Sequence, residues 1–362
     1  MPKIDGLFDE LMKRGGSDLH LGAGYPPLAR IRGDLVALRD AAVDANDVED
    51  VLLELLTPAQ RARLQAQLDL NFAHSHKALA RFRAHYFNKA NGLGAVFRLV
   101  PSRVLTLAEL ACPEVLWRLA DRRSGLVLVT GPACAGKSTT LAAMLDHINK
   151  TRACHILTIE DPIEFVHEPL RAQITQREVG VHASSATAAM RSALRENPDV
   201  VLTAELHTPE AIKLALQLAS YGVLVFATVK TNGAQATLER MVAAFPETEQ
   251  PQIRGMLAES LVGVVAQQLI RTADGKSRVA VHEILIGSSG VSAMIREGKT
   301  AQLPNVMQAG QAQGMQTMDM GLERLLTQSR ISAEDALDRA VDREGFAHVI
   351  ARVRPDLAES MG

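Results

Sequence analysis

The chain has 362 residues, a formal net charge of −2 and only 4% aromatic residues, so it can form two domains or one large one with ample core. This charge balance argues against a dedicated nucleic-acid binder, and no apolar run approaches the roughly 18 residues that a membrane span needs. The N-terminus lacks an apolar signal core and the three cysteines are odd in number, so we expect a cytoplasmic protein in a reduced compartment.

The first hundred residues predict a small α+β domain. After an amphipathic first helix, alternating apolar and polar residues predict strands within 17–24, 29–38, 80–88 and 92–100. Between them, Thr57, Pro58 and Gln60 show the pattern of a helix start: an N-cap, a proline at the first helical position and a capping-box glutamine. We expect this domain to cover residues 1–102, with an interdomain linker at about 101–112.

Residues 125–140, GLVLVTGPACAGKSTT, carry the strongest motif of the chain. An apolar run predicts a buried strand, helical spacing after Lys137 predicts a helix, and between them lies the phosphate-loop pattern G-x-x-x-x-G-K-[ST]. Backbone N–H groups and the helix N-terminus would hold phosphates, Lys137 would neutralise the β- and γ-phosphates, and Ser138 would offer its hydroxyl to Mg²⁺. The residues expected to bind ATP are Gly131, Pro132, Ala133, Cys134, Ala135, Gly136, Lys137, Ser138 and Thr139.

The second domain, residues 103–362, alternates predicted strands and helices. This alternation predicts an α/β fold with a mostly parallel sheet, whose ligand chemistry lies at the carboxyl ends of the strands. Acidic or polar residues follow three of these strands: Glu160, Asp161, Glu164, Glu205 and Lys230. A single acid in such a place is often only a helix N-cap, but three strand ends beside one phosphate loop favour a Mg²⁺-nucleotide site.

Further stretches are specific to one family. They are SDLHLGAG, PPLARIRGD, ARFRAHYFN, TIEDPIEFVH, QREVG, ALRENPDVVLTAE, ESLVGVVAQQLI and GMQTMD. On these stretches and the phosphate loop, the chain resembles the type IV pilus retraction ATPases, the PilT branch of the secretion-ATPase superfamily. The resemblance implies a PAS-like N-terminal domain, a RecA-like motor domain and a homohexameric ATPase that drives pilus retraction in twitching motility. It also implies docking on the pilus platform protein at the inner face of the cytoplasmic membrane.

The resemblance assigns roles to individual residues. It makes Glu164 the acidic-box glutamate and Glu205 the Walker B glutamate, both catalytic. The candidate Mg²⁺ residues Ser138, Glu160 and Asp161 come instead from the phosphate loop and the strand ends. The resemblance also makes three N-terminal arginines candidates for reaching a nucleotide, although each alone reads more simply as a solvated or salt-bridged strand arginine. These are Arg81, Arg83 and Arg98.

The missing zinc insertion separates the branches of this superfamily. Pilus-assembly and type II secretion ATPases usually carry paired CxxC motifs after the Walker B region, whereas no cysteine follows Cys154 here. The retraction branch is therefore favoured.

The chain departs from the family pattern at four sites of one nucleotide-to-motion pathway. Cys134 replaces a loop glycine and adds a Cβ that crowds the loop if the position needs a positive φ, so we expect weakened rather than abolished binding. Val223 and Lys230 replace the two histidines of the histidine box. After the Walker B strand, the segment 206–208 has lost an arginine and an aspartate of the family pattern. In the retraction hallmark, Ser292 and Ala293 replace an arginine and an asparagine.

These departures leave two functions open. The first is an active motor in which Lys230 takes the place of the γ-phosphate sensor. The second is a weakly active or non-hydrolysing ring subunit that regulates or couples an active paralogue, and the sequence leaves open whether the two share one ring. An alternative for Lys230 itself is that it points into solvent or pairs with a carboxylate.

Overall fold

The computed structural model describes residues 2–31, 33–77, 80–100 and 103–353. The chain divides into two compact units, of which the first comprises Met1–Arg103 with Asp161–Val166 and the second comprises Val104–Glu160 with His167–Gly362. Of the linker expected at 101–112, residues 101 and 102 lie outside the described part, and residues 103–112 contain neither helix nor strand. The inclusion of Asp161–Val166 in the first unit is a feature that the sequence did not predict.

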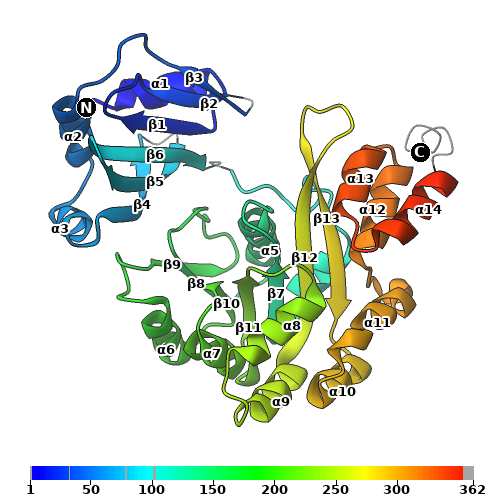
Figure 1. Ribbon diagram of the computed structural model, residues 1–362. Helices are drawn as coiled ribbons and strands as arrows, with labels where there is room; N and C mark the ends of the chain where they lie inside the picture. The colour runs from blue at the N-terminus through cyan, green and yellow to red at the C-terminus, as the bar shows by residue number, and fades with distance from the viewer. Residues whose placement is uncertain (1, 32, 78–79, 101–102, 354–362) are drawn as a thin grey trace. The chain divides into compact units, whose positions relative to one another are not determined.

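The first unit is built on a six-stranded antiparallel sheet in the order β3-β2-β1-β6-β5-β4 (Figure 1). Its strands are β1 (Asp18–Gly22), β2 (Leu28–Ile31), β3 (Asp34–Ala37), β4 (Asp69–His76), β5 (Ala80–Lys89) and β6 (Gly92–Val100). The prediction omitted β4, although buried Leu70 and Phe72 alternate there with exposed Asp69 and Asn71.

Three helices accompany this sheet. They are α1 (Asp5–Lys13), α2 (Ala45–Glu54) and α3 (Pro58–Gln67). Phe8 of α1 stacks on Phe82 of β5 with ring centroids 4.2 Å apart and meets Phe97 of β6 edge-on at 5.1 Å. These contacts anchor α1 to the sheet. The predicted start of α3 is confirmed, because the Thr57 side chain accepts from the Gln60 N–H and the Gln60 side chain accepts from the Thr57 N–H.

The second unit is built on a seven-stranded sheet in the order β13-β12-β7-β11-β10-β8-β9. Its strands are β7 (Gly125–Thr130), β8 (His155–Glu160), β9 (Gln173–Glu178), β10 (Val200–Glu205), β11 (Leu224–Val229), β12 (Leu261–Arg271) and β13 (Arg278–Ile286). All neighbouring pairs are parallel except β12 with β13, so the predicted mostly parallel α/β sheet is confirmed.

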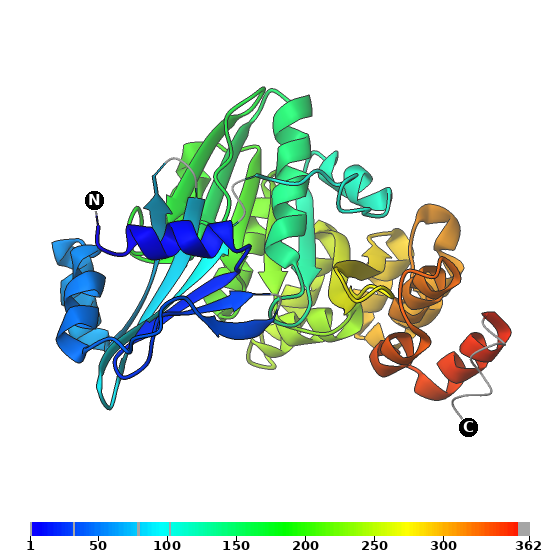
Figure 2. The same cartoon turned by 90° about the horizontal axis from the view of Figure 1, so that it is seen from above.

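Helices cover both faces of this sheet. Because side chains alternate along a strand, Val127 and Val129 of β7 face a core shared with α4 and α5, whereas Leu126 and Leu128 face a core shared with α6 to α9. Figure 2 shows α5 lying along its face of the sheet. These helices are α4 (Val115–Ala120), α5 (Lys137–Thr151), α6 (Ala186–Glu196), α7 (Pro209–Ser220), α8 (Ala234–Ala243) and α9 (Gln250–Ser260).

The described part of the C-terminal region is helical. It contains α10 (Ser289–Glu297), α11 (Leu303–Ala309), α12 (Met318–Thr327), α13 (Ala333–Arg339) and α14 (Arg343–Val353), besides two short 3₁₀ turns. The last three helices lie beside β13 in Figure 1, and they pack together in a small core with β12 and β13. Within the described ranges, no helix combines the length and the apolar character that crossing a bilayer requires.

Candidate nucleotide site

The phosphate loop connects the end of β7 to the start of α5 by a backbone that only small residues can adopt. Gly131 has a φ of 142° and Gly136 a φ of 84°. A Cβ at Gly131 would lie 2.2 Å from the Gln267 carbonyl oxygen, so no other residue fits there. The strand before the loop, the helix after it and the left-handed turns between them make the cradle that a phosphate requires.

Cys134 has a positive φ, the backbone conformation in which its Cβ is expected to crowd the loop. Its φ is 60°, a region in which a residue with a Cβ costs roughly 1–2 kcal/mol more than in a right-handed one. The loop is therefore held in shape against local strain. Cys134 is exposed, whereas burial raises the pKa of the Cys112 thiol to about 12.

Lys137 folds back over the loop that it follows. Its Nζ donates to the carbonyl oxygens of Gly131, at 2.8 Å, and Pro132, at 2.7 Å. This position places the ammonium at the mouth of the cradle, where it can exchange carbonyl oxygens for phosphate oxygens. The residues of the loop thus fit a nucleotide phosphate group.

Three further strands deliver polar residues to the same edge of the sheet. In the order β7-β11-β10-β8 all neighbours are parallel, so their carboxyl ends lie on one side. Lys230 follows β11, Glu205 is the last residue of β10 and Glu160 is the last residue of β8. The sheet therefore brings these three predicted site residues to the phosphate-loop edge.

Lys230 forms an ion pair with Glu205. Its Nζ lies 2.7 Å from Glu205 Oε2, with 63% of the lysine side chain and 29% of the glutamate side chain exposed. Two placements of the Lys230 side chain were left open, at the γ-phosphate or away from it, in solvent or paired with a carboxylate. In the structure Lys230 is paired with a carboxylate. Its assignment as a γ-phosphate sensor stays a prediction.

The predicted Mg²⁺ residues are Ser138, Glu160 and Asp161. Glu160 accepts hydrogen bonds from Thr158 Oγ1, at 2.6 Å, and from Gln176 Nε2, at 3.1 Å. Over the described ranges, no group of three or more His, Cys, Asp and Glu side chains is arranged to hold a metal. The metal assignment stays a prediction.

The first unit engages two of the candidate arginines in pairs. Arg83 Nη1 donates to Glu164 Oε1 at 3.0 Å, so the predicted acidic-box glutamate is held by strand β5. Arg98 Nε donates to Asp18 Oδ1 at 2.8 Å, and Asp18 lies on β1 directly opposite Arg98 on β6. Burial opposes the ionisation of Asp18, but hydrogen bonds from Ser17 and Arg98 outweigh it and hold the pKa of Asp18 below its usual range.

These pairs agree with the plainer reading of Arg83 and Arg98 as salt-bridged strand arginines. Arg81 lies two residues before Arg83 on the same strand. A role of Arg81, Arg83 and Arg98 at a nucleotide stays a prediction.

The comparison with known proteins decides the family. A family model described as "Type II/IV secretion system protein" matches residues 4–350. The chain belongs to this family. Its resemblance to the retraction ATPases extends over nearly the whole length. PilT of Pseudomonas aeruginosa, a type IV pilus retraction ATPase, is 46% identical over 334 residues, covering 92% of this chain and 97% of PilT.

Two other relatives place the chain within this secretion-protein family. PilU of Pseudomonas aeruginosa, a type IV pilus ATPase, is 37% identical over 338 residues, covering 93% of this chain and 88% of PilU. The crystal structure of the pilus retraction motor PilT with bound ADP superimposes with a TM-score of 0.87 at 37% identity, covering 95% of this chain and 98% of that one. The α/β motor fold expected from the resemblance is thereby confirmed.

Proposed function

We propose that this protein is an ATP-hydrolysing motor subunit of the PilT type, which powers retraction of a type IV pilus. The observation that carries the proposal is the phosphate loop, with Lys137 at its mouth and Glu205 on a neighbouring parallel strand, in a chain 46% identical to a retraction ATPase. The test is steady-state phosphate release from Mg·ATP by the purified protein, beside the variant Lys137→Ala. Release that is no faster than in the variant would contradict the proposal.

Each group of the site has a task in hydrolysis. The loop amides and Lys137 bind and orient the phosphates, so that the γ-phosphoryl group faces the strand ends. Glu205 orients a water for attack and accepts its proton, and Glu164 assists from the acidic box. The Ser138 hydroxyl would hold Mg²⁺, with Glu160 and Asp161 as candidates to bind the waters of the ion, and the ion would supply positive charge that offsets the charge of the β- and γ-phosphates.

The assembly belongs to the same proposal. We infer that the protein forms a homohexamer, into which subunits of a paralogue can also enter. We infer further that this ring docks from the cytoplasm on the pilus platform protein of the inner membrane. In such a ring, Arg81, Arg83 and Arg98 become candidates for stabilising phosphate charge across a subunit boundary. Light scattering of the protein with and without nucleotide tests the ring, and a mass that stays that of one chain would contradict it.

The Lys230–Glu205 ion pair supports a second function. An ammonium 2.7 Å from the carboxylate occupies an oxygen of the group that has to receive the proton of the attacking water. A subunit in which this pair persists would bind ATP, hydrolyse it slowly and act by regulating a more active partner. A turnover near that of Lys137→Ala, together with intact ATP binding, would favour this second function.

A further inference from the structure

The buried side chain of Gln267 joins the phosphate loop to the strand beside it. Gln267 lies on β12, directly next to β7, and is 2% exposed. Its Nε2 donates to the carbonyl oxygen of Ala135 at 2.7 Å, and its Oε1 accepts from Thr140 Oγ1 at 2.7 Å. One carboxamide therefore holds both the last turn of the loop and the first turn of α5.

The contact to Ala135 controls where the loop presents its next amide. A trans peptide is planar, with its C=O and N–H pointing in opposite directions. Because the Ala135 carbonyl points to Gln267, the N–H of Gly136 points away from Gln267. Loop amides turned to one side in this way form a cradle for phosphate oxygens.

His282 of β13 completes the hydrogen-bond network of Gln267. Its Nε2 lies 3.2 Å from Gln267 Oε1, an acceptor, so Nε2 carries the proton. The side chain is 1% exposed, and burial, with the nearby charge of Arg324, lowers its pKa to about 4. His282 is thus a neutral donor that fixes the orientation of the Gln267 carboxamide.

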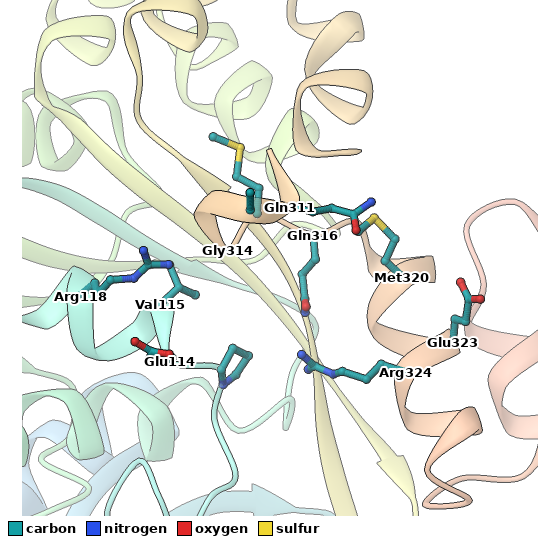
Figure 3. A pocket seen from close by; sticks show the side chains of 12 residues that line it. Glu114, Val115, Arg118, Gln311, Gly314, Gln316, Met320, Glu323 and Arg324 are labelled. Atoms are coloured by element: carbon teal, nitrogen blue, oxygen red, sulfur yellow. The ribbon is translucent and has the colours of Figure 1, made fainter. Parts of the chain in front are cut away.

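The network continues to the far side of β13. Gln316 Nε2 donates to the His282 carbonyl oxygen at 2.5 Å. Gln316 and Arg324 line a cavity of about 770 Å³ together with residues of α4, as Figure 3 shows. Gln267, His282 and Gln316 therefore link the phosphate loop to the wall of this cavity, through the side chain and the backbone carbonyl of His282.

We propose that Gln267 is a positioning residue for the nucleotide phosphates, and that it acts by holding Ala135 and Thr140 in the phosphate-accepting arrangement. This inference rests on the proposed nucleotide binding. A carboxamide of this length meets all three demands. An ionised glutamate cannot donate to Ala135, and a methionine can neither donate to Ala135 nor accept well from Thr140 and His282.

The experiment compares Gln267→Met with Gln268→Met in the full chain. Gln268 is the matched control, because the same side chain on the next residue of β12 points to the opposite face of the sheet. Fluorescent-ADP titration should show affinity reduced about tenfold in Gln267→Met, which corresponds to about 1.4 kcal/mol, and nearly unchanged in Gln268→Met. The Michaelis constant for ATP should rise by a similar factor with turnover at saturation changed little, because phosphates are held in ground and transition states alike.

The outcomes separate this inference from the proposed function. A wild-type chain that is folded and binds no nucleotide overturns the proposed function and with it this inference. A wild-type chain that binds ADP no better than Gln267→Met overturns this inference alone. If Gln267→Met does not fold, Thr140→Val decides, since it removes one of the hydrogen bonds and keeps the side-chain shape. It should weaken ADP binding about threefold, and unchanged affinity would overturn the inference.

Discussion

Removing the Lys230 ammonium should raise the rate of ATP hydrolysis. The variant Lys230→Met keeps most of the side-chain length and frees the Glu205 carboxylate, which the structure pairs with Lys230 at 2.7 Å. Glu205 is then able to accept a hydrogen bond and a proton from the attacking water without competition from the lysine.

The size of this effect follows from the exposure of the pair. With 63% of the Lys230 side chain in solvent, the ion pair is screened and belongs to the class that contributes about 0.2–1 kcal/mol. If breaking the pair is part of the activation barrier, its removal raises turnover by up to about fivefold. The thermal stability of Lys230→Met should change little for the same reason.

Restoring both family histidines, with Lys230→His and Val223→His, should raise turnover further and lower the affinity for ATP.

The assay is phosphate release at saturating Mg·ATP, with fluorescent-ADP titration as a check on binding. Lys299→Met is the matched control, because Lys299 forms an exposed pair with Glu297 that also measures 2.7 Å but lies at the C-terminal end of α10. Its turnover should equal that of the wild type. Turnover in Lys230→Met that stays at or below the wild-type value, with ADP binding intact, would refute the argument that the ion pair restrains hydrolysis.

Three further predictions concern the loop and the N-terminal arginine. Lys137→Ala should weaken Mg·ATP binding about ten- to a hundredfold, because a charge-assisted contact to phosphate contributes roughly 1.5–3 kcal/mol, and equal affinities by fluorescent-nucleotide titration would contradict this. Exposed Cys134 should be alkylated faster than Cys112, whose thiol pKa of about 12 keeps it protonated at pH 8. Bound ATP should slow the alkylation of Cys134, and mass spectrometry that finds no such protection would place Cys134 outside the cradle. Arg83→Gln, which breaks the 3.0 Å pair with Glu164, should reduce turnover more than nucleotide affinity, whereas lost binding with normal turnover at saturation would make Arg83 an ordinary ligand.

Local patterns were sufficient to predict much of the fold and the strand–loop–helix at residues 125–140. The phosphate loop was predicted because the strand, the glycines, the lysine and the following helix all lie within residues 125–140. The capping box at Thr57 and Gln60 and the strand ends at Glu205 and Lys230 were read in the same way, from a few consecutive residues. Alternating strands and helices were enough to predict a mostly parallel sheet, since parallel neighbours need a crossover between them.

The partners of these residues were decided only by the tertiary structure. The pairing of Lys230 with Glu205 follows from β10 and β11 being neighbours, and that of Arg98 with Asp18 follows from the register of β1 and β6. The place of Gln267 beside the phosphate loop depends on β12 adding to the sheet next to β7. In each pair the two residues are distant in the chain, and a single sequence carries no signal for such a contact, because strand order and register are set by the packing of the whole sheet.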